Sequence, residues 1–267
     1  MNNCYASVGF LGKLSDIELL ERILLYNYET ISKFNYIVVK NTCNPEMDVH
    51  YDAYNNVWKK IFGSNVIILP KTKNRGHTFG TLDADNEIVN YSKSLPIKYI
   101  FKTASDILIS PKILNYPLSD EYQFYFLQGI GYTGLEKFGF DTSTYLNQYL
   151  KIENLYPQTN FYIIDKNINT LNDINLINLN YDYCMSMPNY NGKAWEYVKD
   201  FSCESLLRDC IQRNSLKYKH LISDETFVKL VEYIKTHKVC DCSHKNIYIE
   251  ELGICHFAFP NDPCIII

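Results

Sequence analysis

In the stretch YIFKTASDILIS, residues 99–110, an apolar run is followed by a single acid, Asp106. This acid is the clearest candidate in the chain for a catalytic or metal-binding residue. The apolar residues predict a buried strand over 97–106, with Asp106 at the carboxyl end. A buried carboxylate is costly unless it is paired or bound to a metal. Mg²⁺ or Mn²⁺, which is often held by one or two carboxylates plus phosphate oxygens, would supply that partner. An equally good interpretation is that Asp106 caps a turn or a helix before ILISPKIL.

A basic loop, KTKNRGHTFG, precedes that strand at residues 71–80. Arg75 could contact a phosphate or a base, and Gly76 would let backbone approach it. The simpler interpretation is a solvated loop between a strand and a helix, and the pattern of a P-loop is absent. Lys40 and Asn41 end another predicted strand, and in a parallel sheet they would converge with this loop and with Ser105 and Asp106.

Two acidic pairs have both a structural and a functional interpretation. Asp83 and Asp85 read DAD, but they fall early in a predicted helix, where acids offset the helix dipole, and we favour that role over a metal pair. Asp224 and Glu225 follow Ser223, a natural N-cap. They are first-turn acids of a helix or, alternatively, a general base that takes a proton from an acceptor hydroxyl.

The histidine and cysteine residues give weaker indications of a metal site. His256 could complete a metal site, although a satisfied, partly buried histidine is more common. Cys240, Cys242 and His244 lie in CDCSH, and C-x-C spacing matches zinc sites poorly, so we expect free thiols. The nine cysteines show no regular spacing and no secretory signal starts the chain, which predicts a reducing, cytoplasmic location. The final CIII has the form of a prenylation signal, but Ile is an unusual last residue for it.

The elements that must position these residues alternate regularly through residues 1–106. Ser15 and Glu18 have capping-box spacing at the start of the first helix. The alternation predicts a parallel sheet with helices on both faces, and ligands bind such sheets outside the carboxyl ends of the strands. The strands are expected at 4–10, 35–41, 65–70 and 97–106, and the helices from residue 15, at 49–62 and at 81–93.

The second half of the chain is less regular. We expect strands at 122–132 and 160–167, one or two helices within 192–214, a helix at 223–238 and an extended stretch at 246–260. No internal repeat, low-complexity tract or linker is evident, so we predict a single domain over 1–267.

Composition excludes several classes of protein. The chain has 267 residues, 46% of them hydrophobic and 15% aromatic, as expected for a globular protein with a large core. The net charge of −4 argues against a protein that coats nucleic acid. No apolar run approaches the length needed to span a bilayer.

Residues 73–114 resemble the GT-A class of nucleotide-sugar glycosyltransferases, especially the family 2 type. The shared features are an Asn/Arg-Gly loop at 74–76, a helix that carries Asn86, a strand that ends on the acid Asp106, and Pro111 five residues later. The segment SDETFVKLVEYIKTHKV resembles the helix that carries an acidic pair in that class, and His256 occupies a place similar to that of a histidine that completes its metal site.

The resemblance implies an α/β, mostly parallel, Rossmann-like GT-A sheet flanked by helices, with an elaborated C-terminal half. Residues 1–114 would bind the nucleotide and residues 115–267 the acceptor. A hexosyltransferase-like enzyme would move sugar from a nucleotide-diphosphate donor to a hydroxyl of a glycan or another acceptor, with inversion. Mn²⁺ or Mg²⁺ would be held by Asp106 and His256, and Asp224, ranked before Glu225, would be the base. The candidate nucleotide-binding residues are Lys40, Asn41, Arg75, Asp85 and Ser105.

This chain departs from the class pattern at one informative place. Ala104 and Ser105 occupy the first two positions of the DxD-like motif, so only its last acid remains. That departure keeps open a non-catalytic protein that binds a nucleotide or sugar on a decayed GT-A fold. A sugar nucleotidyltransferase is the other alternative, since GFLGKLSD near the first strand holds two glycines and a lysine.

Overall fold

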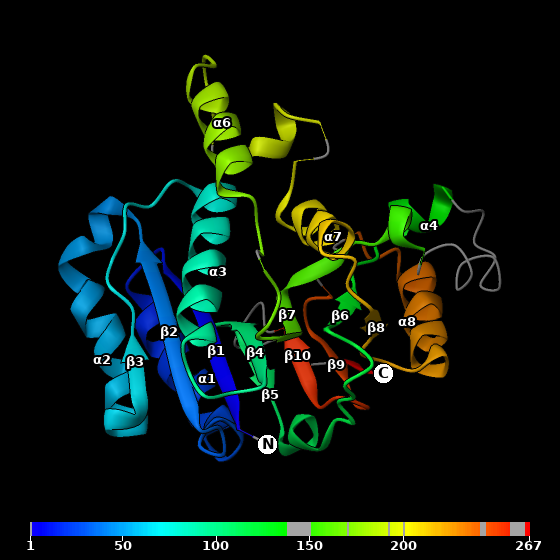
Figure 1. Ribbon diagram of the computed structural model, residues 1–267, viewed down its shortest axis with the longest axis horizontal. Coiled ribbons are helices and arrows are strands. Elements are labelled where there is room, and N and C mark those ends of the chain that lie inside the picture. The colour runs from blue at the N-terminus through cyan, green and yellow to red at the C-terminus, as the bar shows by residue number, and fades with distance from the viewer. Residues whose placement is uncertain are drawn as a thin grey trace.

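The computed structural model describes residues 2–137, 151–169, 171–191, 193–199, 201–240, 244–256 and 265–267. A seven-stranded sheet has the order β3-β2-β1-β4-β7-β6-β8, and a four-stranded sheet has the order β11-β9-β10-β5. Helices lie on both sides of the larger sheet (Figure 1). The Cys264 of the terminal CIII and the Cys242 of CDCSH lie outside the described residues.

The first half of the chain builds the parallel part of the larger sheet. Strands β1, β2, β3 and β4 are all parallel, as the alternation predicts. The elements are β1 (Asn3–Leu11), α1 (Ser15–Ile31), β2 (Tyr36–Cys43), η1 (Pro45–His50), α2 (Tyr51–Phe62), η2 (Gly63–Asn65), β3 (Val66–Ile68), α3 (His77–Lys93), β4 (Tyr99–Ala104), β5 (Ile107–Ile109) and η3 (Pro111–Asn115).

The second half extends the sheet with a reversal of direction. Strand β7 runs antiparallel to both β4 and β6, and β8 runs parallel to β6. The elements are β6 (Phe124–Gln128), α4 (Tyr132–Lys137), η4 (Ile152–Asn154), β7 (Pro157–Asp165), α6 (Ile174–Met185), η5 (Ala194–Glu196), α7 (Cys203–Arg213), β8 (Tyr218–His220), α8 (Asp224–His237), β9 (Ile247–Ile249), β10 (Ile254–His256) and β11 (Ile265–Ile266).

The larger sheet is buried on both faces because successive side chains alternate between them. Tyr5, Phe101 and Ile163 belong to the apolar cluster that includes α1 and α2. Their neighbours Ala6 and Ile100 belong to the cluster that includes α3 and α7. This double coverage explains why the strands read as continuous apolar runs in the sequence.

Three local predictions are corrected. Helix α1 has no capping box: Leu14 is its N-cap, without a side-chain bond, and Asp16 Oδ2 instead accepts from the N–H groups of Gly12 and Lys13. Helix α3 begins at His77, four residues early, directly after Gly76, whose φ is 87°. Strand β4 ends at Ala104, and Ser105 and Asp106 form a turn into β5.

Helix α6 was not expected from the sequence. It projects at the top of Figure 1, above α3. The first turn of this helix packs in an apolar cluster, in which Ile177 lies with Phe79 and Leu82 of α3 and with Phe201 beside α7. Within the described residues, no helix combines the length and the hydropathy that crossing a bilayer requires.

Helix α1, which packs on the larger sheet, also bonds to the smaller sheet through Asn27. Asn27 donates to the Ile107 carbonyl at 2.7 Å and accepts from the Ile109 N–H at 2.8 Å, so its amide brackets β5. Strand β10 pairs with β5 in antiparallel register, with His256 opposite Ile107. Residues 265–266 of the terminal segment pair with β9 as a parallel strand.

Candidate active site at the turn between β4 and β5

Asp106 and His256 face one another, the first from a turn and the second from the end of a strand. Asp106 lies in the turn that connects β4 to β5, and His256 ends β10, which pairs with β5. Asp106 Oδ2 lies 3.2 Å from His256 Nε2. The Asp106 side chain is 41% exposed and the His256 side chain 12%, so a ligand can reach the carboxylate while the imidazole is held in place.

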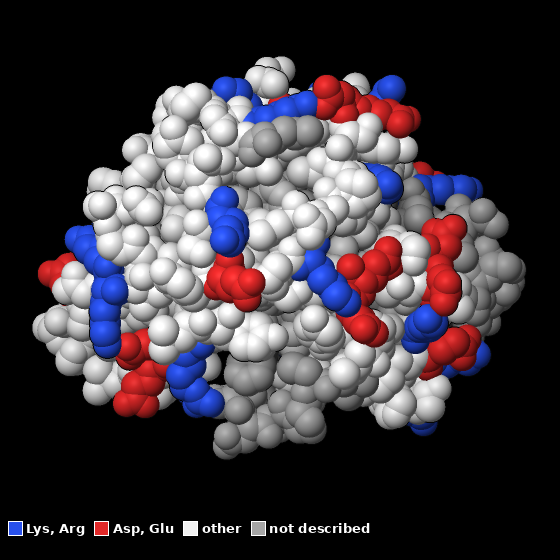
Figure 2. Space-filling view, turned by 90° about the horizontal axis from the view of Figure 1, so that it is seen from below, with Lys and Arg blue, Asp and Glu red and all other residues white. Residues whose placement is uncertain are grey.

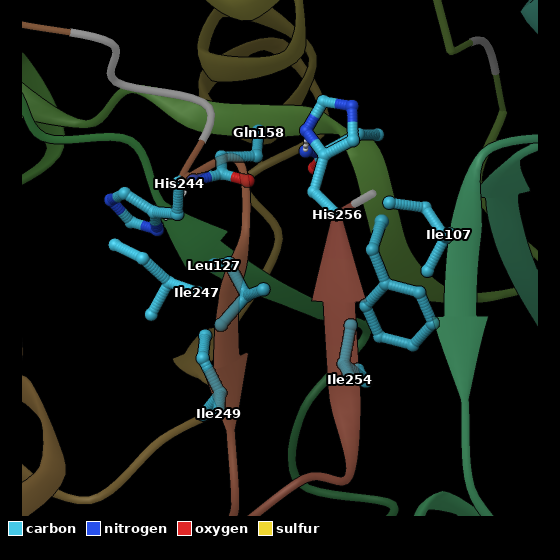
Figure 3. A pocket seen from close by; sticks show the side chains of 10 residues that line it. Ile107, Leu127, Gln158, His244, Ile247, Ile249, Ile254 and His256 are labelled. Carbon is cyan, nitrogen blue, oxygen red and sulfur yellow. Dashed lines mark hydrogen bonds between the residues drawn. The ribbon is translucent and has the colours of Figure 1, made fainter. Parts of the chain in front are cut away.

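The imidazole of His256 has a second partner on β7. Asn160 Nδ2 lies 2.8 Å from His256 Nδ1, and two residues earlier Gln158 Nε2 lies 2.8 Å from His244 Nδ1. The four side chains line a pocket between the two sheets. Figure 3 shows Gln158, His244 and His256 at its upper end and the branched apolar side chains below, which are Ile107, Leu127, Ile247, Ile249 and Ile254.

The donor set of this pair fits a divalent cation. Neighbouring ligands of an octahedral cation bound at about 2.1 Å lie about 3 Å apart, which is close to the 3.2 Å between Asp106 Oδ2 and His256 Nε2. The carboxylate suits Mg²⁺ and Mn²⁺, and the imidazole adds a nitrogen ligand of the kind that first-row transition metals accept. The described residues contain no group of three or more His, Cys, Asp or Glu arranged around a metal position. Phosphate oxygens and waters would therefore have to complete the coordination.

Polar side chains from β2 and α2 meet Ser105 beside the turn. Tyr54 Oη lies 3.4 Å from Ser105 Oγ, next to Asp106. Asn41 donates to Asn55 Oδ1 at 2.8 Å, and its own Oδ1 is buried with no hydrogen-bond partner among the described residues. A Cβ on Gly9 would overlap Asn41 Oδ1, so glycine is required there. The structure thus brings Asn41 and Ser105, two predicted nucleotide contacts, to the same edge as Asp106.

Lys40 points to the opposite face of β2 from Asn41. It is fully buried, and its Nζ donates to Glu87 Oε2 and to the Pro70 carbonyl, both at 2.5 Å. The charge of the ammonium group is thereby paired with the Glu87 carboxylate on that face of the sheet. The structure does not bring it to Asp106.

Arg75 ties the loop after β3 to two helices. Its guanidinium makes a bidentate pair with Asp83 at 2.6 and 2.5 Å and donates to Asn178 of α6 at 2.8 Å. The guanidinium also lies 4.7 Å from the Tyr181 ring centre. Hydrogen bonding to Asp83 raises the pKa of Arg75. In this structure Arg75 fastens α6 to α3.

Asp85 is the partner of a buried lysine. It is 1% exposed, and its Oδ1 lies 3.1 Å from Lys102 Nζ while Tyr162 donates to Oδ2 at 3.4 Å. Burial raises the pKa of Asp85, and Lys102 opposes that effect. Since α3 begins at His77, neither Asp83 nor Asp85 is in its first turn, so the helix-dipole interpretation was wrong and both acids serve ion pairs instead.

Asp224 and Glu225 lie on the exposed first turn of α8. Ser223 caps the helix by accepting from Thr226 N–H, as predicted, and its N–H and hydroxyl bond to Glu251. Glu251 precedes Gly253, whose carbonyl accepts from Ser110, whereas Asp106 faces the other end of β10. No contact in the described part of the chain joins either acid to the Asp106–His256 pair.

Asn160, which contacts His256 from β7, was not among the predicted site residues, because the carboxyl ends of strands mark the site edge only in a parallel sheet. Because β7 is antiparallel, its beginning lies at the edge where β4 ends. The polar run PQTN before FYIID was the available signal. Cys240, for which the sequence predicts a free thiol, is an exposed free thiol.

Comparison with solved structures shows that the chain has the GT-A fold of nucleotide-sugar glycosyltransferases. No protein-family model matches the sequence, and no curated protein is significantly similar to it. Solved structures do match. An active-site mutant of LgtC has 8% identity and a TM-score of 0.51 over 96% of this chain and 88% of its own. The glycosyltransferase GlyE of Streptococcus pneumoniae has 12% identity and a TM-score of 0.49 over 97% of this chain and 56% of its own. Mouse xyloside xylosyltransferase 1 has 9% identity and a TM-score of 0.44 over 97% of this chain and 99% of its own.

Proposed function

We propose, from the GT-A fold of this chain and the pair at its β4–β5 turn, that it transfers a sugar from a nucleotide-diphosphate donor to a hydroxyl acceptor. The observation that carries the proposal is the approach of Asp106 to His256 at 3.2 Å beside a solvent-accessible turn. A nucleotide-linked hexose is the donor class that the family resemblance implies. The cytoplasmic location stays a prediction from the sequence.

The two residues would hold Mn²⁺ or Mg²⁺ through Asp106 Oδ2 and His256 Nε2. When bound, such a cation neutralises the charge that develops on a diphosphate leaving group. Ser105 and Asn41 lie where the nucleotide would contact the ends of β1, β2 and β4. The sheet and α1 fix these positions before a donor binds, so little reorganisation accompanies the reaction.

The inverting course stays a prediction, with Asp224 or Glu225 as base, and their placement does not support it. We therefore assign them no role at the pair. The net charge of −4 does not favour a nucleic-acid acceptor. On the face that Figure 2 shows, basic and acidic side chains are interspersed.

The test is turnover of a panel of nucleotide sugars with Mn²⁺ by wild type, Asp106→Asn and His256→Gln. Each variant should lose about 10²–10³-fold in kcat/KM, the usual cost of losing one preorganised charge-stabilising group. Asp120→Asn is the matched control, because Asp120 is 82% exposed and pairs with Lys98 away from the site. Wild-type activity in Asp106→Asn would contradict the proposal.

Binding measured in the same samples distinguishes a transferase from the non-catalytic alternative. The alternative is favoured by Ala104, which stands where the DxD-like motif has its first acid. A nucleoside diphosphate at about 100-fold over its Kd should stabilise the fold by about 2.7 kcal/mol with Mn²⁺ present. Such stabilisation with no turnover of any sugar donor would identify a binding protein on a decayed transferase fold. Formation of a nucleotide sugar from a sugar phosphate would identify a nucleotidyltransferase.

A further inference from the structure

The imidazole of His256 is held between a carboxylate and an amide. Its Nε2 faces Asp106 Oδ2 at 3.2 Å, and its Nδ1 faces the Asn160 amide at 2.8 Å. Asn160 lies on β7, in the larger sheet, whereas His256 lies on β10, in the smaller one. The amide therefore contacts the ring across the space between the two sheets.

A neutral imidazole carries one N–H, and these two partners decide which nitrogen holds it. An ionised carboxylate can only accept, so facing Asp106 the proton belongs on Nε2. Nδ1 then accepts from the Asn160 Nδ2–H, which agrees with the orientation of the amide in the structure. This arrangement satisfies both ring nitrogens without a cation.

Ligation of a cation through Nε2 needs the other tautomer. The proton must then be on Nδ1, which requires an acceptor in place of the Asn160 Nδ2–H. An amide can meet both needs, because a half-turn of its terminal group replaces Nδ2–H₂ with Oδ1. A carboxylate at this position could only accept, and an apolar side chain could do neither.

We propose that Asn160 is a positioning residue that lets His256 exchange between these two tautomers. In one, Nε2–H donates to Asp106 and Nδ2–H donates to Nδ1. In the other, Nδ1–H donates to Asn160 Oδ1 and the Nε2 lone pair is available to a divalent cation. One proton leaves Nε2 and one is gained at Nδ1, so the ring stays neutral. The inference rests on the proposed function, since it assigns the cation to that site.

The tautomer of His256 can be read directly from its ring ¹⁵N shifts by NMR. Wild type without cation should show Nε2–H, and addition of Mg²⁺ with a nucleoside diphosphate should convert it to Nδ1–H. Asn160→Asp should show Nδ1 protonated under both conditions. Asn160→Leu should weaken Mn²⁺ binding, measured by EPR with the same nucleotide, by about 10–100-fold, the usual effect of losing a partner that orients a ligating histidine.

Gln158→Leu is the matched control, because it removes the same kind of amide–imidazole pair from the neighbouring His244. It should leave the His256 tautomer and Mn²⁺ binding unchanged. The proposal is overturned if cation-free wild type shows Nδ1–H, or if folded Asn160→Leu binds Mn²⁺ as wild type does, and sugar transfer could still stand in either case. Conversely, a tautomer exchange in a protein that turns over no sugar donor would support the role of Asn160 and refute the transferase.

Discussion

The carboxylates of Asp224 and Glu225 are exposed at the start of α8, and Glu225 pairs with Lys229 at 2.8 Å. We expect Asp224→Asn and Glu225→Gln to keep sugar transfer within a few-fold of wild type, since no contact among the described residues links them to Asp106. Steady-state kinetics with the best donor would measure this. A loss of about 10²-fold or more in either variant, the scale of a general base, would restore the predicted inverting role.

His220 gives the molecule a pH dependence of known sign. Burial, and to a lesser degree the charge of His244, lowers the pKa of His220 from 6.5 to about 3. Below pH 6.5 the unfolded chain takes up a proton here that the folded chain does not. Stability from this residue is therefore complete above pH 6.5 and is lost as pH falls toward 3, by at most about 1.4 kcal/mol per pH unit.

Denaturant unfolding between pH 7 and 5 would test that prediction. His220→Gln should flatten the dependence, because glutamine cannot titrate but can still accept from the Gln128 N–H that His220 Nε2 contacts at 3.1 Å. An unchanged slope in the variant would show that other groups govern it.

Among the elements, the turn between β9 and β10 has a strict steric requirement. Gly253 has φ +67°, and a Cβ there would overlap Ser110 Oγ. In the same turn the Gly253 carbonyl accepts from the Ser110 N–H at 2.7 Å. This bond helps to fix the position of β10, the strand that ends at His256.

Gly253→Ala should therefore destabilise the fold more than Gly63→Ala does. Gly63 also has a positive φ, +65°, but nothing in the described part of the chain lies within 4 Å of a Cβ added there. Backbone strain should cost about 1–3 kcal/mol at both positions, and the overlap should add about 1–3 kcal/mol at Gly253 alone. Equal losses in urea unfolding would mean that Ser110 moves aside freely.

At the scale of the whole molecule, the two halves of the chain share their sheets. Strand β4 pairs with β7, and β5 pairs with β10, so residues 1–114 supply strands whose partners lie in residues 115–267. The single domain stays a prediction, and it has a direct test. A fragment of residues 1–114 should fail to fold, because it exposes the edges of β4 and β5.

The full chain should then unfold in one transition seen alike by circular dichroism and by tryptophan fluorescence. Trp58 of α2 packs against Tyr5 of β1, and it reports on the first half alone once Trp195, the other tryptophan of the sequence, is replaced by phenylalanine. Separate transitions, or a fragment that unfolds cooperatively by itself, would mean two folding units.

The sequence by itself determined the parallel strands of the first half and the helix predicted over 223–238, and it singled out Asp106 as a candidate metal ligand. These follow from local causes: apolar periodicity, a serine cap, and the cost of a carboxylate beside a buried strand. Only the tertiary structure decided that Lys40 pairs with Glu87, that Asp85 pairs with Lys102, and that Asn160 and His256 meet at the Asp106 turn. The physical reason is that strand direction and register, set by contacts between residues far apart in the chain, choose which face and which edge each side chain reaches.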